Sequence, residues 1–579
     1  MLSPPSLHSA LIYDPAYGWL LHRAPLHLLQ AQTPREIPAL LQQVEEALAN
    51  GHHIAGFLAY ESASAFDQAF CVSTDKTDFP LAWFGIYPPP EVIKLPPPED
   101  VEPLSWQPLW DEATFTRKVE AIHAAIARGE TYQVNLTFPL QCDTLPDDPW
   151  RFFVALVHGQ RAEGAAYIDT GRFVITSASP ELFFEREGAT LRCRPMKGTL
   201  PRHPEGGNDH KRRDALHHST KDRAENVMIL DMIRNDLARL GGEVTVDNLF
   251  SVEKYPTVWQ MTSTASTRSP ASFSQILFAL FPCASITGAP KVRTMELIAT
   301  LEERPRRIYT GSIGHLAPDG RSRFNVAIRT ALFDRESGRG TYGVGAGITW
   351  SSEAKAEYHE CLAKGRILTH PLPCFDLLES LLWEPLLGYA LLSEHLERLA
   401  ASADYFDRLY PKTDICVKMK NLAQTLPPLP HKVRLLLAAN GTFNLEAAPL
   451  AAPRADPLRL ALASSPVSSD SPFIYHKTTH RIIYETAKES ACPKADEVLL
   501  WNKRGELTET LTANLVLEID GENLTPALGC GLLPGTLRRQ QLERGTLREA
   551  VLKPEDLYRA RKVWLINSVR GWREAVLLD

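Results

Sequence analysis

A chain of 579 residues is too long to fold around one hydrophobic core, because single cores stop growing at about 250–300 residues. Length alone suggests about four domain-sized units, and prolines indicate where the chain divides. YPPPEVIKLPPPEDVEP (87–103) is extended and cannot continue a helix, and HPLPC (370–374) is a second interruption. We expect one unit over 1–371, with a β-rich part over about 1–103 and a core over about 110–370, and another over 372–579.

Composition excludes several classes of protein. The net charge of −7 does not favour nucleic acid or an anionic membrane, both of which attract a basic face. No apolar run approaches the roughly 20 residues that span a bilayer, and the first residues lack the basic segment of a signal peptide. The nine cysteines form no C-x-x-C pair, which favours reduced thiols. We expect a cytoplasmic protein that binds neither nucleic acid nor membrane.

Hydrophobic periodicity predicts helices and strands throughout the chain. Apolar residues at helical spacing predict helices at about 112–128, 219–240 and 353–368, and strands are expected at 131–138 and 172–177. A new α/β pattern follows the second interruption. It begins with a helix over 391–406, with Ser393 as its N-cap, and it includes a hairpin that turns at Asp520-Gly521.

Most motifs of common enzymes are absent or lack their context. GRGTYG (338–343) satisfies G-x-G-x-x-G, but strand-like residues follow it instead of a helix, so we reject dinucleotide binding. The sequence has no P-loop, no H-E-x-x-H, no G-x-S-x-G and no G-x-C-x-G glutaminase motif.

Two charged features are ambiguous by themselves. Lys197 in CRPMKGT (193–199) could be a solvated lysine at a strand end. In EAKAEYHECLAKG (353–365), Glu353, Glu357, Glu360 and Lys364 share one helical face, which could simply be a solvated surface with salt bridges. Glu225, near the start of the other long helix, supplies a further carboxylate. Carboxylates from two helices would suit a hard cation such as magnesium.

The order of eight segments resolves this ambiguity. SASPELFF, RPMKGT, KDRAENVMILDMIRND, ASITGAPKVRTMELI, YTGSIGHL, FNVAIRT, YGVGAGI and ECLAKG follow one another as in the chorismate-utilising enzymes, and the resemblance covers nearly all of 110–370. That family includes anthranilate, isochorismate and salicylate synthases and aminodeoxychorismate synthase component I. The lysine before Gly-Thr resembles the last branch, since anthranilate synthases typically carry alanine there.

The resemblance implies roles for individual residues. Lys197 would be a nucleophile that adds at ring carbon C2 and expels the C4 hydroxyl, before ammonia at C4 displaces it. Glu181 would be the acid/base group, and Glu225, Glu360 and Glu357 would bind magnesium. One departure is Gln260, which stands where relatives often have histidine. The residues expected to bind substrate are Gly198, Thr199, Thr287, Gly288, Tyr309, Arg329, Gly345, Ala346, Gly347 and Lys364.

The second half resembles another family. HLERL (395–399), YHKTTHRIIY (475–484), LTETLTANLV (507–516) and TPALGCGLLPGTLR (525–538) resemble 4-amino-4-deoxychorismate lyases of the fold type IV, branched-chain aminotransferase-like pyridoxal phosphate enzymes. The N-terminal strands of that fold look shortened here. The resemblance implies the following cofactor contacts: Arg398 on the phosphate, Lys477 in covalent linkage and as catalytic base, Glu509 on the pyridinium nitrogen, and Gly535, Thr536 and Leu537 beside the phosphate.

Together the resemblances imply an α+β chain, in which a chorismate-binding β-sandwich-like domain with flanking helices precedes a fold type IV pyridoxal phosphate α/β domain. The first would aminate chorismate to 4-amino-4-deoxychorismate, with magnesium and with ammonia from a glutamine amidotransferase subunit. The second would eliminate pyruvate to give 4-aminobenzoate, the folate precursor, and could form a homodimer. The alternative is an anthranilate or isochorismate synthase with a non-catalytic C-terminal module.

Overall fold

The computed structural model describes residues 5–73, 78–99, 101–160, 162–368, 373–452 and 456–578. These residues form two compact units. The N-terminal unit extends to the predicted interruption (370–374), of which residues 370–372 lie outside the described residues. The C-terminal unit begins at Pro373 and also includes Arg202–Arg212, a segment from far earlier in the chain. We call this segment the strap.

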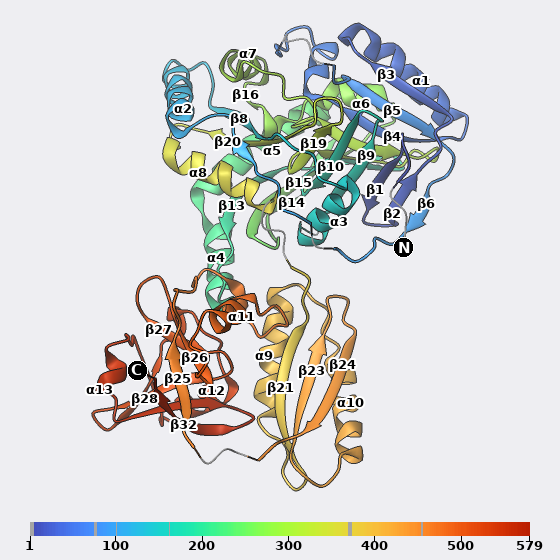
Figure 1. Cartoon of the computed structure of the whole chain (residues 1–579). Coiled ribbons are helices and arrows are strands. Elements are labelled where there is room, and N and C mark those ends of the chain that lie inside the picture. The colour runs from blue at the N-terminus through green and yellow to red at the C-terminus, as the bar shows by residue number, and fades with distance from the viewer. Residues whose placement is uncertain are drawn as a thin grey trace. The chain divides into compact units, whose positions relative to one another are not determined.

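Two antiparallel sheets of ten strands each build the N-terminal unit (Figure 1). The first sheet contains β16 (Gly288–Ala289), β8 (Gln133–Cys142), β20 (Arg339–Ile348), β19 (Thr330–Asp334), β10 (Phe173–Ser179), β9 (Gly164–Asp169), β1 (Ala10–Asp14), β2 (Gly18–His22) and β6 (Glu91–Ile93) in that order, with β7 (Gln107–Pro108) also on β8. The second contains β13 (Met196–Pro201), β15 (Val258–Arg268), β12 (Thr190–Arg194), β11 (Leu182–Glu187), β18 (Ser322–Val326), β17 (Ser312–Leu316), β4 (His53–Leu58), β5 (Ala82–Tyr87) and β3 (His27–Ala31), with β14 (Val244–Lys254) also on β15.

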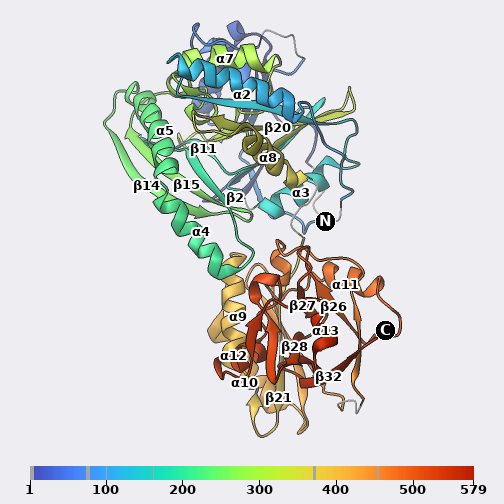
Figure 2. The same cartoon turned by 90° about the vertical axis from the view of Figure 1, so that its left-hand side faces the viewer.

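Helices cover the outer faces of these sheets, and an apolar layer fills the space between them. Residues of β1, β4, β5, β9, β10 and β17 form that inner layer. The helices are α1 (Ile37–Ala49), α2 (Glu112–Ala127), α3 (Pro149–Gln160), α4 (Gly206–His218), α5 (Thr220–Ala238), α6 (Phe273–Leu280), α7 (Lys291–Glu302) and α8 (Ala354–Gly365). The α2, α3 and α8 helices share a core with the first sheet, and α1, α5 and α6 share one with the second. Figure 2 shows α5 lying along β14 and β15.

The first 103 residues are part of these same two sheets. β1 pairs with β9 and β4 pairs with β17, so N-terminal strands continue sheets that begin in the predicted core. Even the proline-rich stretch contributes a strand, because β6 pairs with β2. The stretch 87–103 is extended as expected at Glu91–Ile93, but there it pairs within a sheet, because EVI has no proline to remove a ladder hydrogen bond.

The C-terminal unit has a small and a large sheet. The small antiparallel sheet orders β22 (Gly388–Tyr389), β21 (Leu377–Glu384), β23 (His431–Leu437) and β24 (Phe443–Pro449). Two helices, α9 (Leu392–Tyr405) and α10 (Lys412–Thr425), share one apolar core with it. The large sheet orders β27 (Leu507–Thr510), β26 (Glu497–Trp501), β25 (Leu458–Leu462), β32 (Gly571–Leu577), β31 (Lys562–Asn567), β28 (Asn514–Ile519), β29 (Glu522–Pro526) and β30 (Arg548–Ala550).

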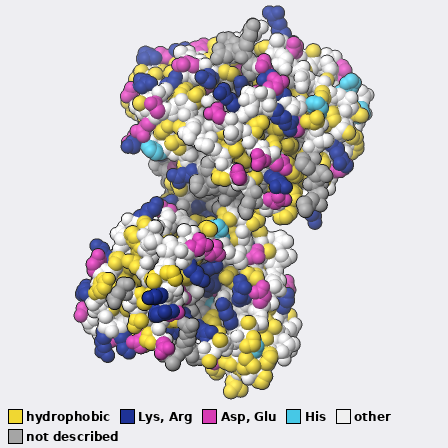
Figure 3. Space-filling model, in the orientation of Figure 1, with side chains coloured by type: hydrophobic (Ala, Val, Ile, Leu, Met, Phe, Trp, Pro, Cys, Tyr) yellow, Lys and Arg dark blue, Asp and Glu magenta, His cyan; other side chains and the backbone are white. Residues whose placement is uncertain are grey.

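In the large sheet β27 also pairs with β28, which closes six of its strands into a ring. The remaining helices of this unit are α11 (Ile482–Glu489), α12 (Thr536–Glu543) and α13 (Asp556–Arg559). The predicted α+β organisation is confirmed by these mixed sheets and helices. None of the helices among the described residues is long and apolar enough to cross a membrane. On the face shown in Figure 3, acidic and basic side chains are interspersed.

Two local predictions in the C-terminal unit had different outcomes. The turn at Asp520-Gly521 is confirmed, since both residues have positive φ (51° and 82°) between β28 and β29. The prediction that Ser393 caps α9 is wrong. The N-cap is Leu391, in the left-handed region, and the hydroxyl of Ser393 donates to Glu397 inside the helix at 3.4 Å.

Candidate active sites

Lys197 lies at an irregularity in the second sheet of the N-terminal unit. The pairing of β13 with β15 shifts register between Met196 and Thr199, so Lys197 and Gly198 form a bulge. Gly198 has φ +93°, and a Cβ there would lie 2.9 Å from the Cβ of Asp222. The bulge therefore needs glycine, and bulges commonly redirect a neighbouring side chain.

The amine of Lys197 lies among groups that can tune it. Its Nζ would be 3.3 Å from a Cβ placed on Gly347, so the glycine leaves room for the ammonium. Burial lowers the pKa of Lys197, while the Glu181 and Glu225 carboxylates raise it. The net direction is downward, toward the neutral amine that can act as a nucleophile.

Glu181 follows β10 and is buried, with an exposed fraction of 4%. Its Oε1 has no hydrogen-bond partner within the described structure. Burial raises the pKa of Glu181, although a hydrogen bond with Ser285 and the charge of Lys197 oppose that rise. A carboxyl group with a raised pKa and an unused oxygen is suited to proton transfer.

The three carboxylates predicted to bind magnesium come from two helices, α5 and α8. Burial raises the pKa values of Glu225 and Glu357, and Glu357 adds to the rise at Glu225. Glu360 differs, because the ammonium of Lys364, 2.9 Å away, lowers its pKa. Within the described ranges, no group of three or more His, Cys, Asp or Glu side chains is arranged to hold a metal ion. Magnesium binding at this place therefore stays a prediction.

Small residues let backbone approach backbone beside Lys197. A Cβ on Gly288 would lie 2.0 Å from the carbonyl oxygen of Gln133, and one on Gly345 would lie 2.7 Å from Thr137. Lys364 donates to the carbonyl of Gly345 at 2.9 Å. The hydroxyl of Thr287 donates to the carbonyl groups of Cys283 and Ala284, so it faces its own turn. Ala346 lies between Gly345 and Gly347 of β20 and is buried.

Arg329 and Tyr309 both lie near Tyr342. Arg329 has φ +49° and donates to Gln160 at 2.8 Å. Burial lowers the pKa of its guanidinium, which has no carboxylate partner among the residues that the structure describes. Tyr309 packs its ring against Gly343, where a Cβ would lie 2.1 Å from the ring. A partly buried guanidinium without a carboxylate partner among the described residues is suited to a substrate carboxylate.

Gln133 is a site residue that the sequence reasoning missed. Its exposed fraction is 1%, and neither its amide nitrogen nor its oxygen has a partner in the described structure. The nitrogen lies 2.5 Å from the position of a Cβ on Gly347, on the same side as Nζ of Lys197. A buried amide without partners is costly unless a ligand satisfies it. The signal was available in β8, where Gln133, Asn135 and Thr137 give an inward face that is polar.

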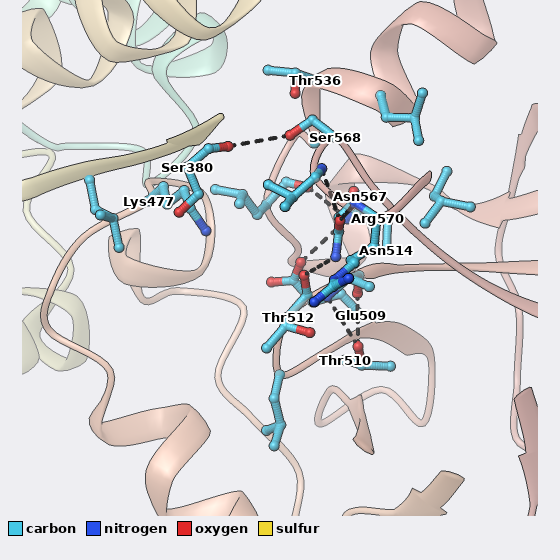
Figure 4. A pocket seen from close by; sticks show the side chains of 18 of the residues that line it. Ser380, Lys477, Glu509, Thr510, Thr512, Asn514, Thr536, Asn567, Ser568 and Arg570 are labelled. Carbon is cyan, nitrogen blue, oxygen red and sulfur yellow. Dashed lines mark hydrogen bonds between the residues drawn. The ribbon is translucent and has the colours of Figure 1, made fainter. Parts of the chain in front are cut away.

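The second site is a cavity of about 480 Å³ in the C-terminal unit. Figure 4 shows Lys477 on the side of Ser380, and Glu509 beside Asn514. Burial, together with the charge of Arg398, lowers the pKa of Lys477 to about 8. Burial raises the pKa of Glu509 to about 7, against hydrogen bonds that include one from Tyr484 at 2.9 Å.

Arg398 lines this cavity but is already engaged. Its Nε and Nη2 donate to Glu379 at 2.9 and 2.6 Å, and its Nη1 donates to the carbonyl of Pro534 at 3.1 Å. Burial opposes ionisation of Glu379, yet Arg398 and His395 lower the pKa of that carboxyl to about 2. Sequence reasoning missed Glu379, although a glutamate inside the apolar run LLESLLW is unusual for a strand.

The start of α12 completes the cavity wall. Gly535 is the N-cap, and a Cβ there would lie 2.0 Å from Oδ1 of Asn514. Thr536 and Leu537 open the helix, where the first backbone N–H groups lack partners inside the helix. Such a helix start can hold a phosphate. Gly535, Thr536 and Leu537 all line the cavity that contains Lys477 and Glu509.

Comparisons with known proteins confirm the resemblance to chorismate-utilising enzymes in the first half, and they confirm an aminotransferase-like domain in the second. A model of chorismate binding enzymes matches residues 91–370, and a model of class IV amino-transferases matches 376–577. Aminodeoxychorismate synthase component 1 of Salmonella typhimurium is 38% identical over 272 residues, which are 46% of this chain and 59% of that protein. Anthranilate synthase component 1 of Streptomyces coelicolor is 36% identical over 284 residues, 47% of this chain and 53% of that protein.

The chain thus spans somewhat more than half the length of these curated relatives. Among solved structures, anthranilate synthase component I from Streptococcus pneumoniae has a TM-score of 0.53 with 23% identity, covering 64% of this chain and 93% of that one. This likeness shows the fold of the N-terminal unit.

Proposed function

Because residues 91–370 belong to the chorismate binding enzymes and residues 376–577 to the class IV amino-transferases, we propose that this chain makes 4-aminobenzoate from chorismate in two steps. The N-terminal unit aminates chorismate at C4. The C-terminal unit then removes pyruvate from the 4-amino-4-deoxychorismate that is formed.

The first step is supported mainly by the position of Lys197 and by the lowered pKa of its amine. Its amine adds at C2, the ring double bonds shift, and the C4 hydroxyl leaves with a proton from Glu181. Ammonia then adds at C4, the double bonds shift back, and the bond between Lys197 and C2 breaks. The two displacements return the amine to the face that the hydroxyl left. The lowered pKa of Lys197 and the raised pKa of Glu181 both favour the protonation states that this sequence needs.

Substrate is held by groups that lack other partners. Arg329 donates to Gln160 through Nη1 only, so its remaining N–H groups are available for the enolpyruvyl carboxylate, and the amide of Gln133, which has no partner in the described structure, is free for a ring substituent or ammonia. Carboxylates are the ligands that magnesium prefers, so Glu225, Glu357 and Glu360 would hold it, and it would neutralise the ring carboxylate. Oxygen atoms of substrate and water must complete this ligand set.

A class IV amino-transferase domain implies pyridoxal phosphate, and the second cavity fits it. One cavity is lined by Lys477, whose pKa is lowered, by the carboxyl group of Glu509 and by the start of α12, which can hold the phosphate. When bound, the cofactor supplies an electron sink. Lys477 would hold it and would serve as the base for the proton on C4, which must leave as the C3–O bond to the enolpyruvyl group breaks. Glu509 would pair with the ring nitrogen, and Arg398 with the start of α12 would hold the phosphate.

The charge of the cavity favours a ligand with several anionic groups. Seven of its lining residues are Lys or Arg, and Glu509 is the single Asp or Glu among those described. Lys432 and Arg434 come from one face of β23, while Arg481, Arg570 and Arg573 come from the larger part of the unit. The cofactor phosphate and the two carboxylates of aminodeoxychorismate would together offset most of this excess.

Ammonia must come from elsewhere, since the sequence carries no glutaminase motif. We therefore include a separate glutamine amidotransferase subunit in the proposal. The purified chain should use ammonium salts, and it should use glutamine only when such a subunit is added.

The test is incubation with chorismate, magnesium, ammonium and pyridoxal phosphate, followed by identification of the aromatic product. We expect 4-aminobenzoate and pyruvate from the whole chain. Lys197→Ala should abolish the first step and keep pyruvate release from supplied aminodeoxychorismate. Anthranilate or isochorismate as the product would instead support the alternative, in which the C-terminal unit is not catalytic.

A further inference from the structure

Gln260, on β15, contacts the strand that carries Lys197 with both ends of its amide. Its Oε1 accepts from the hydroxyl of Thr199 at 2.8 Å, and its Nε2 donates to the carbonyl of Gly198 at 2.8 Å. The side chain is 9% exposed, so water offers little replacement for either bond. One side chain therefore ties two consecutive residues of β13.

These bonds take the place of strand pairing that the bulge has removed. The β13–β15 register breaks between Met196 and Thr199, and regular pairing resumes with Thr199 opposite Gln260. On the other side, Nδ2 of Asn226 donates to the carbonyl of Lys197 at 3.3 Å. The bulge is thus held by two amide side chains, one from β15 and one from α5.

The two hydrogen bonds of Gln260 require a side chain that both donates and accepts, as an amide does. Gln260 donates to a carbonyl and accepts from a hydroxyl through two atoms on the same carbon. A carboxylate has acceptors only, so it would leave the carbonyl of Gly198 facing negative charge. An aliphatic side chain would satisfy neither partner, and both would stay buried without a bond.

We propose that Gln260 is a positioning residue that fixes the Lys197 bulge so that the amine reaches C2 of the substrate. The inference rests on the proposed amination, in which Lys197 is the nucleophile. A displacement of about 1 Å at the bulge would carry Nζ out of attacking distance and can cost about 100-fold in rate. Gln260 itself touches no reacting atom.

The first test is Gln260→Leu and Gln260→Glu in the full chain with ammonium as nitrogen donor. We expect kcat for amination to fall about 10- to 100-fold, with KM for chorismate changed less than about threefold. Thr264→Val is the matched control, because Thr264 lies on the same strand outside the contact and should leave both constants unchanged. If Gln260→Leu fails to fold, Gln260→Glu keeps the size and polarity of the side chain and supplies the measurement.

A double-mutant cycle tests whether the effect passes through Lys197. In a Lys197→Ala background, where amination is absent, Gln260→Glu should leave the dissociation constant for chorismate unchanged, because the bulge then positions no nucleophile. Weaker chorismate binding there, a rise in KM that matches the loss of kcat/KM, or an unchanged kcat would each overturn the inference. Absence of aminodeoxychorismate from the unmodified chain would instead overturn the proposed function, so the two failures are distinct.

Discussion

Burial shifts the pKa values of Lys477 and Glu509 toward each other. That of the lysine falls to about 8 and that of the glutamate rises to about 7. Both groups therefore titrate close to neutral pH, where their ordinary values are far apart. Neither change could be read from the motifs, because the burial of both groups and the charge of Arg398 beside Lys477 arise only when distant segments meet.

Cofactor uptake by the apo protein should depend on the protonation of Lys477. Only the neutral amine bonds the cofactor aldehyde, so the rate of uptake should rise with pH and level off above about 8. An ordinary lysine would continue to gain up to about pH 10.4. The measurement is the visible absorbance that develops when pyridoxal phosphate is added at a series of pH values. A midpoint near 10 would show that the lysine is not buried in this way.

The lowered pKa of Lys477 also makes the stability of the folded apo protein depend on pH. A buried lysine with a lowered pKa is protonated more weakly when folded, so it costs stability below pH 8, and the cost disappears as pH rises toward the unfolded value. Lys477→Met should therefore raise the melting temperature of the apo protein at pH 7 by about 1–4 °C. The difference from the unmodified chain should shrink at pH 10; an equal difference at both pH values would contradict the explanation.

The proposed magnesium ligands can be tested with a control from the same helix face. Glu360→Gln should reduce amination about 100-fold at limiting magnesium and less at high concentration, because an oxygen ligand without charge binds a hard cation more weakly. Glu353→Gln, at the N-cap of α8, changes the same charge outside the predicted set and should behave like the unmodified chain. Equal magnesium dependence in both variants would remove Glu360 from the site.

At the scale of elements, periodicity was sufficient for the long helices. Apolar spacing gave α2, α5 and α8 nearly to their ends. Periodicity did not predict β6, because this strand forms only where the chain comes back beside β2 and pairs with it. Periodicity also failed to give the N-cap of α9. The N-cap is Leu391, in the left-handed region, so the helix begins at Leu392 and Ser393 lies inside it. Local propensity predicts elements, whereas pairing and caps depend on the chain path.

The start of α12 is an element whose geometry allows a sharp test. Gly535→Ala would place a methyl group 2.0 Å from Asn514, and this contact with Oδ1 should displace the helix start. We expect the concentration of pyridoxal phosphate that gives half-saturation to rise about 10-fold or more, since the phosphate depends on those N–H groups. Gly529→Ala is the control, because a Cβ at Gly529 would meet no atom within 4 Å. Titration of cofactor absorbance compares the two.

At the scale of the whole molecule, the strap belongs to the unit that is remote in sequence. Arg202 forms an ion pair with Asp209 at 2.7 Å, in which both side chains are nearly inaccessible. Its guanidinium also stacks on the ring of Tyr405, 4.1 Å away, and donates to the carbonyl of that residue at 3.0 Å. No sequence motif indicated this arrangement, because it depends on contacts across some two hundred positions of chain.

Removal of Arg202 should therefore destabilise the C-terminal unit. Arg202→Ala takes a buried ion-pair partner from Asp209, which should lower the free energy of unfolding by about 3–5 kcal/mol. The loss should appear in the unfolding transition followed by release of bound pyridoxal phosphate. Arg213→Ala is the control, because its contact with Asp214 is exposed. If both variants unfolded at the same denaturant concentration, the strap would not contribute to this unit.

The strap also limits how the two activities can be separated or recombined at the level of the gene. A cut near codon 373 yields a C-terminal product that lacks Arg202–Arg212 and so exposes the ring of Tyr405. The matching N-terminal product keeps a segment whose partners are gone. Exchange of either half with that of another organism would therefore need the strap to be exchanged with the C-terminal half, as an insert between β13 and α5. We therefore expect that one reading frame for the two halves serves the stability of the C-terminal unit as well as linked expression.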